Sequence, residues 1–324
     1  MGIRAILRSS GLAQLTAIFG LSALAVLSAV NSSAGIQGSG RRSFAAIGTI
    51  GSIGTGVTVG GVVYSTDGAT IEIDGQPGKK GQLRRGYVVT LRGDVTESGQ
   101  ASASEITFNG SVQGTVAALD PQSGSFFVLG QAVHVDSNTL FSNPLRTAGL
   151  AGMHNGDVVE VSGYTDSTGE LLATRVNVEN LNSPARIAGS VHSLDTAAHT
   201  FRINSLSVDY RAAETTGKLT EGAPVVVEGT SLRADGTLVA ARVEVVRGFG
   251  VAGADGRVEG VITSFASSNY FEVNGQPVAV GAHVKMNLQT PLGLDVAVRV
   301  TGVFDSDGVL VATRVQDWKK SRKK

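Results

Sequence analysis

The sequence has no cysteine, few aromatic residues and little proline, and each shortage narrows the possible folds. Without cysteine there is no disulfide framework and no lipid-modified N-terminal cysteine, so packing alone must hold the fold together. Aromatic residues make up 5% of the chain and there are 7 prolines, against 43 glycines. With frequent Val and Thr, this composition favours many short strands joined by tight turns. We therefore predict an all-β fold.

The first 34 residues have the pattern of a secretory signal peptide. Arg4 and Arg8 give a basic start, an apolar run follows over 15–30, and Ser32-Ser33-Ala34 offers a small-residue cleavage site. The apolar run has 16 residues, fewer than the roughly 20 that a membrane-spanning helix needs. We expect an exported protein, periplasmic or secreted. An uncleaved segment that anchors the protein in a membrane is the alternative.

Charge is divided unevenly along the chain. Removal of the signal peptide with its two arginines leaves 25 Lys and Arg against 27 Asp and Glu, and five of those positive charges lie at 319–324. Since clustered Lys and Arg supply affinity for phosphate backbones, the acidic body predicts no nucleic-acid partner. The tail is a candidate tether to an anionic membrane or polysaccharide, with a frayed end as the alternative. Its basic residues are Lys319, Lys320, Arg322, Lys323 and Lys324.

Internal repeats give the domain organisation. A G-x-V-V-x-V-x-G pattern recurs four times with variations, and its last residue is glycine at 93, 163, 229 and 302. A large apolar residue lies three positions before each copy and is suited to plug a core: Leu83, Met153, Leu219 and Leu292. Each unit also has an opening strand with a glycine suited to a bulge. A further strand carries an aromatic core residue, which we assign to Phe127, Phe201 and Phe271, with Ile71 in the first unit.

Three strands, an irregular segment and two more strands are the order of the OB-fold, a small five-stranded barrel. We predict a tandem array of small five-stranded OB-like barrels behind the signal peptide. The first barrel is expected to be degenerate or to be a capping unit, because the segment between Asp74 and Leu83 is too short for a third strand and its loop. Short joints predict a semi-rigid row. The bounds are a signal peptide at 1–34, a Gly/Ser-rich leader at 35–56, barrels at 57–109, 110–180, 183–247 and 255–317, and a basic tail at 318–324.

These motifs also carry a resemblance to a known family. The G-x-V strand, the aromatic strand and the D-G-x-L-x-A-x-x-V hairpin together resemble exported bacterial proteins built from tandem copies of an OB-like domain of unknown function. The resemblance covers nearly the whole chain after the signal peptide and is best in the second to fourth units. It implies an envelope or secreted location and a barrel fold, and it supplies no catalytic residues.

The sequence shows no motif of an enzyme or a metal site. It has no G-x-S-x-G elbow, its Gly-rich run at 48–56 lacks the Lys-Ser/Thr of a phosphate-binding loop, and its five histidines lack metal-ligand spacing. The Asp-Ser-Asp-Gly stretch at 305–308 is interpreted as a hairpin turn rather than part of a calcium loop. We therefore predict no enzymatic activity, no cofactor and no metal.

Three hypotheses about function follow, in descending order. The first is an exported, non-enzymatic protein that binds an envelope or extracellular ligand such as a glycan, since OB-like barrels hold oligosaccharides on one face. The second is a structural spacer or assembly component that binds a partner protein, and the third is a hydrolase. Aromatic side chains that line one groove would favour the first hypothesis, and aromatic side chains that are all buried would favour the second. The candidate ligand contacts are Tyr164, Tyr210 and Phe304, with Tyr64 and Tyr87 as further rings near strand ends.

Overall fold

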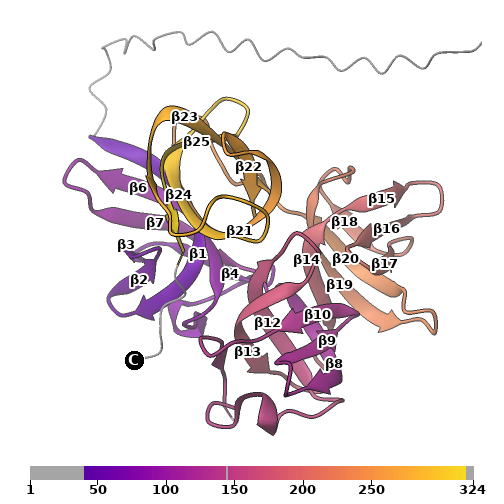
Figure 1. Cartoon of the computed structure of the whole chain (residues 1–324). Helices are drawn as coiled ribbons and strands as arrows, with labels where there is room; N and C mark the ends of the chain where they lie inside the picture. The colour runs from indigo at the N-terminus through magenta and orange to yellow at the C-terminus, as the bar shows by residue number, and fades with distance from the viewer. Residues whose placement is uncertain (1–39, 144, 319–324) are drawn as a thin grey trace, which may run out of the picture. The chain divides into compact units, whose positions relative to one another are not determined.

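The computed structural model describes residues 40–143 and 145–318, and these form an almost entirely β-stranded protein (Figure 1). The prediction of an all-β fold made of small five-stranded barrels in tandem is confirmed. Within the described residues, no helix has the length and apolar character needed to cross a membrane. The predicted signal peptide and the basic residues of the tail lie outside the described part of the chain.

The strands fall into four units with the same order. Unit 1 contains β1 (Arg41–Ile53), β2 (Gly56–Val59), β3 (Val62–Ser65), β4 (Thr70–Ile73), β5 (Gln76–Pro77), the short helix η1 (Lys80–Gln82), β6 (Val88–Thr96) and β7 (Ala101–Phe108). Unit 2 contains β8 (Val112–Asp120), β9 (Ser125–Val128), β10 (Gln131–His134), β11 (Leu140–Phe141), η2 (Gly149–Gly152), β12 (Val158–Thr165) and β13 (Leu171–Val178).

The two C-terminal units repeat this order with small changes. Unit 3 contains β14 (Ala185–Ser190), β15 (His192–Asp195), β16 (Thr200–Ile203), β17 (Leu206–Asp209), β18 (Glu214–Thr216), β19 (Pro224–Leu232) and β20 (Leu238–Val245). Unit 4 contains β21 (Asp255–Ser267), β22 (Tyr270–Val273), β23 (Gln276–Asn287), β24 (Ala297–Phe304) and β25 (Leu310–Asp317).

Strand pairing joins the main strands of each unit into a small barrel. In unit 1 the pairs run β1–β2–β3–β7–β6 and return to β1. In unit 2 they run β8–β9–β10–β13–β12 and return to β8. Units 3 and 4 follow the same path, with the first strand of unit 3 split into β14 and β15. The third and fifth strands pair in parallel, which is why the segment between the third and fourth strands must cross the barrel end.

The recurring glycine of the fourth strand lies at a bulge. The register between the fourth and fifth strands shifts next to Gly93, Gly163 and Gly302. A Cβ atom at any of these positions would overlap a carbonyl oxygen of the fifth strand. Only glycine permits that close approach, so the repeated residue marks a backbone requirement of the barrel rather than a site.

The segment predicted as a loose leader contains β1, so the prediction is wrong for residues 41–53. β1 pairs antiparallel with β6 and supplies Phe44, Ala46 and Ile50 to the buried core of unit 1. Small residues between these apolar positions hide the alternation that marks a strand. With β1 as its first strand, unit 1 is a complete barrel and not a degenerate one.

The aromatic core position was misassigned in unit 2. Phe126, Phe201 and Phe271 are fully buried, whereas Phe127 is 40% exposed. Side chains of a strand point alternately inward and outward, so either of two adjacent phenylalanines can be the inward one. In β9 the inward ring is Phe126. In unit 1 the matching strand is β2, where Val57 is buried, so Ile71 on β4 is not the equivalent residue.

The four barrels do not form a simple row in chain order. β8 pairs antiparallel with β14, which joins units 2 and 3 in one sheet. β1 pairs in parallel with β21, which joins unit 1 to unit 4 in a second sheet (Figure 1). Each opening strand therefore covers the free edge of another, as exposed edges require. The short joints between successive units did not reveal that the fourth unit pairs with the first.

Candidate functional site

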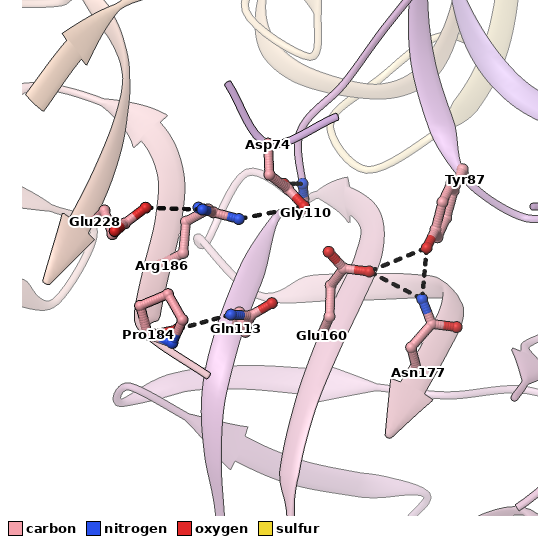
Figure 2. A network of polar contacts seen from close by, with 9 residues as sticks. All are labelled: Asp74, Tyr87, Gly110, Gln113, Glu160, Asn177, Pro184, Arg186 and Glu228. Atoms are coloured by element: carbon pink, nitrogen blue, oxygen red, sulfur yellow. Dashed lines mark hydrogen bonds and ion pairs between the residues drawn. The ribbon is translucent and has the colours of Figure 1, made fainter. Parts of the chain in front are cut away.

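A buried polar seam lies where units 1, 2 and 3 meet, and it consists of Asp74, Tyr87, Glu160, Asn177 and Arg186 (Figure 2). Glu160 on β12 is 5% exposed, and its Oε2 accepts hydrogen bonds from the Tyr87 hydroxyl at 3.2 Å and from Asn177 Nδ2 at 2.9 Å. The Asn177 amide also donates to the Tyr87 oxygen at 2.8 Å. The three groups thus tie the fourth and fifth strands of unit 2 to the segment before β6 of unit 1.

Arg186 forms the other half of the seam (Figure 2). Its guanidinium lies 3.2 Å from Asp74 Oδ2 in unit 1 and 2.8 Å from Glu228 Oε2 in its own unit. The second oxygen of Asp74 accepts a hydrogen bond from the Gly110 amide at 2.9 Å. One arginine of unit 3 therefore holds a carboxylate of unit 1, although the two units are not successive in the chain.

The carboxyl of Glu160 has an unusual proton affinity. Burial raises its pKa to about 8, and the nearby negative charge of Asp74 acts in the same direction. Burial also raises the pKa of the Tyr87 hydroxyl well above its ordinary value. Near neutral pH this raised pKa favours the protonated form of Glu160 beside Asp74.

A second buried carboxylate lies at the joint of units 1 and 4. Glu259 on β21 is 2% exposed, and Arg299 Nε donates to its Oε1 at 2.6 Å. Its Oε2 accepts a hydrogen bond from the Thr49 backbone amide of β1 at 3.2 Å. The Thr49 hydroxyl in turn lies 2.9 Å from the Tyr164 hydroxyl of unit 2. Here a charged pair, rather than a neutral acid, links the barrels.

A cleft of about 890 Å³ opens between units 2, 3 and 4, and Ile47 and Val88 of unit 1 also belong to its lining. Its wall includes the exposed ring of Phe127 and the loop 166–170 that joins the last two strands of unit 2. The hairpin tips at 204–205 of unit 3 and 274–275 of unit 4 also line it. The pairing of opening strands, the buried polar seam and the contacts of Glu259 hold these three units in place, so the cleft is a product of barrel packing.

Of the aromatic residues predicted to contact a ligand, only Tyr164 belongs to the lining of this cleft, so the predicted rings do not line one groove together. Tyr164 is 3% exposed and packs against Trp318 at 5.0 Å between ring centroids. Phe304 is 1% exposed in the core of unit 4, while Tyr210 is half-buried against Phe201. Tyr64 and Tyr87 are buried as well. Four of the five rings, all except Tyr210, are therefore buried.

Sequence reasoning missed both glutamates and the exposed ring of Phe127. Glu160 lies in GDVVEVSG and Glu259 in RVEGVITSF, where alternation with the preceding valine predicts an outward side chain, so the local pattern gave no signal for their burial. The predicted tether residues Lys319, Lys320, Arg322, Lys323 and Lys324 lie outside the described residues. Within the described ranges, no group of three or more His, Asp or Glu side chains is arranged to hold a metal ion.

Comparison with known proteins identifies the repeated unit. No curated protein matches the chain. The solved structure "drosophila Unr CSD456" is 16% identical, with 65% of this chain and 98% of that chain covered, and its TM-score of 0.18 supports no conclusion about function. A family model described as "Domain of unknown function (DUF5666)" matches residues 47–107, 113–177, 186–244 and 259–316. These matches cover most of the chain, and the protein belongs to this family as four copies of its domain.

Proposed function

We propose that the protein is an exported, non-enzymatic structural component whose four barrels pack as one body and bind a partner protein of the cell envelope. The observation that carries this proposal is the pair of buried polar contacts at the barrel joints, centred on Glu160 and Glu259. Buried polar groups in fixed geometry favour one arrangement of neighbouring elements over others. Such contacts are expected where the relative position of the barrels matters.

The placement of the aromatic rings supports the same proposal. Buried rings favour a spacer or assembly component over a protein that stacks ligands along a row of barrels. Tyr87 and Tyr164, two of the rings considered for ligand contact, instead donate or share hydrogen bonds across barrel joints. These two rings thus serve to join barrels.

Export is part of the proposal and rests on the sequence of residues 1–34. We expect a periplasmic or secreted protein that begins at Gly35, with an uncleaved anchor as the alternative. N-terminal sequencing of the protein from fractionated cells tests this. Recovery of the uncleaved chain from the membrane fraction would favour the anchor.

Site-specific photo-crosslinking in intact cells tests the partner. A crosslinking residue is placed at Val63, Leu232 or Val251, which are exposed on units 1 and 3 and on the joint before unit 4. The expected result is repeated capture of the same envelope protein from at least one position, and its loss when Glu259→Gln disturbs the joint between units 1 and 4. A folded, exported protein that captures nothing from any of the three positions would contradict the proposal.

Ligand binding is the second candidate function because of the cleft between units 2, 3 and 4. Its volume lies within the range of about 300–1,000 Å³ that is usual for small-molecule sites. The structural role and the ligand role are compatible, since the packing that joins the barrels also forms the cleft.

A further inference from the structure

The cleft between units 2, 3 and 4 combines one exposed ring, one unpaired carboxylate and several hydroxyl and amide groups. We propose that it binds a neutral oligosaccharide, with Phe127 as the stacking platform and Glu272 as the main acceptor for sugar hydroxyls. This inference rests on the second candidate function and names its ligand class.

The charge of the cleft argues for an uncharged ligand. The described lining holds no Lys or Arg, and its one histidine, His192, lies with Nδ1 3.7 Å from Glu221 Oε1, so phosphate, sulfate and uronate groups would find no permanent cation there. Three carboxylates are present, but two are occupied. Asp166 Oδ1 accepts from the backbone amides of Thr168 and Glu170 at 2.9 Å each, and Glu170 Oε2 lies 2.8 Å from His134 Nε2. A single free carboxylate is too little charge to favour a polycation.

Glu272 is that free carboxylate. It lies half-buried on β22 of unit 4, and the described residues offer it no ion pair or hydrogen-bond donor. A carboxylate oxygen pair can accept two neighbouring hydroxyl groups, and hydrogen bonds to an ionised acceptor are stronger than neutral ones. Vicinal hydroxyls of a sugar ring present that pair of donors.

Phe127 supplies the apolar part of the site. Its ring is 40% exposed on β9 although the neighbouring strand residues Phe126 and Val128 are fully buried. A pyranose has one face of C–H groups, which packs on an aromatic ring while its hydroxyls point outward. A neutral sugar therefore uses both kinds of surface that this cleft offers.

Two tight hairpin tips complete the wall. Asn204 and Asn274 both have positive φ, at 50° each, as the favoured two-residue hairpin turns require. Asn204 Nδ2 donates to Gln131 Oε1 at 2.8 Å across the joint of units 2 and 3, which fixes this tip against unit 2. Thr263 Oγ1 accepts from the Gly275 amide at 3.1 Å and keeps its own proton to donate to a ligand. The polar groups are thus held in place before a ligand arrives.

A glycan array followed by titration calorimetry on the full mature protein tests the inference. We expect binding of one or more neutral oligosaccharides, with affinity reduced roughly tenfold or more by Phe127→Ala and by Glu272→Gln. Tyr270→Ala and Glu214→Gln are matched controls, since both residues are exposed and outside the cleft lining. These two variants should bind as the wild type does.

Each other outcome overturns a defined part of the inference. Neutral glycan binding that all four variants retain would place the site elsewhere. Binding restricted to sulfated, phosphorylated or uronate glycans would overturn the ligand class and leave the second candidate function standing. Failure to bind any glycan or envelope polymer, by a protein with native circular dichroism, would overturn the inference and the second candidate function together.

Discussion

Glu160 and Glu259 are both buried glutamates at barrel joints, yet their surroundings are opposite. Glu160 is bonded to the neutral groups of Tyr87 and Asn177. Glu259 is bonded to the guanidinium of Arg299 and to a backbone amide. The same residue type therefore links units 1 and 2 as an uncharged acid and units 1 and 4 as one partner of an ion pair, because the neighbouring groups decide which form can be buried.

This difference predicts that the two joints respond differently to pH. A neutral buried acid is lost as a stabilising group when alkaline conditions remove its proton. The joint of units 1 and 4 instead holds an ion pair with arginine, a side chain that stays charged throughout this pH range. The joint of units 1 and 2 should therefore loosen at high pH, while the joint of units 1 and 4 should not.

The largest expected effect is the pH dependence of stability that Glu160 confers. Its folded pKa of about 8 exceeds the ordinary value of 4.5, so the folded state binds the proton more tightly than the unfolded state. The contribution of Glu160 to the free energy of unfolding is fully present below pH 4.5 and is lost as pH rises to about 8. The loss is about 1.36 kcal/mol per pH unit, which gives about 3–5 kcal/mol over the whole range. Urea unfolding of the wild type between pH 4.5 and 8.5 should show this decline.

Glu160→Gln keeps the shape and the hydrogen-bond acceptor and removes the titrating proton. The decline should shrink in this variant, which should be more stable than the wild type above pH 8. It should not vanish, because burial also raises the pKa of the neighbouring Glu179. Glu259→Gln is the control and should keep the wild-type pH slope. An unchanged slope in Glu160→Gln would show that Glu160 is ionised in the folded protein.

The second prediction breaks the joint of units 1 and 4. Glu259→Gln leaves the partly buried guanidinium of Arg299 without its carboxylate, and we expect a loss of about 2 kcal/mol in the free energy of unfolding. Hydrogen exchange should rise at the β1–β21 pairing more than at the β8–β14 pairing. Glu97→Gln, at an exposed glutamate of unit 1, should change stability by less than about 0.5 kcal/mol. Equal exchange at both pairings would contradict the assignment.

The third prediction compares the glycines that make room for each glutamate. A Cβ atom at Gly48 would lie 2.6 Å from Glu259 Oε2, whereas one at Gly110 would lie 3.0 Å from Glu160 Cγ. Gly48→Ala must displace the ion-paired carboxylate and should cost about 2 kcal/mol, while Gly110→Ala should cost about 1 kcal/mol or less. Thermal unfolding of the two variants measures the difference. A larger cost at Gly110 would reverse the inferred tightness of the two joints.

Much of the fold could be predicted from the sequence because it is written in local patterns that recur. The glycine of the fourth strand marks a bulge in every unit, and its period located the units. β1 was missed because small residues blur its alternation, and Phe127 was placed inside because adjacent phenylalanines leave the phase open. Neither error concerns the barrel order, which depends on pattern over a whole unit.

The joints could not be predicted in the same way. Any of the four opening strands could pair with any other, and only three-dimensional packing selects β1 with β21 and β8 with β14. Glu160 and Glu259 each look like an outward strand residue in the sequence. Their burial depends on a neighbouring barrel that is distant in the chain, so no local pattern distinguishes a buried acid from a solvated one.

The smallest expected effect separates the two tyrosines that serve these joints. Tyr87 donates to Glu160, and Tyr164 shares a hydrogen bond with Thr49 beside Glu259. Tyr87→Phe and Tyr164→Phe each remove one hydroxyl, and each should lower the free energy of unfolding by about 1 kcal/mol at pH 6. A donor to a carboxyl favours its ionised form, so the loss of the Tyr87 hydroxyl should raise the pKa of Glu160 further. Urea unfolding at pH 6 and pH 9 should therefore show a steeper alkaline decline for Tyr87→Phe than for Tyr164→Phe, and equal declines would mean that Tyr87 does not act on Glu160.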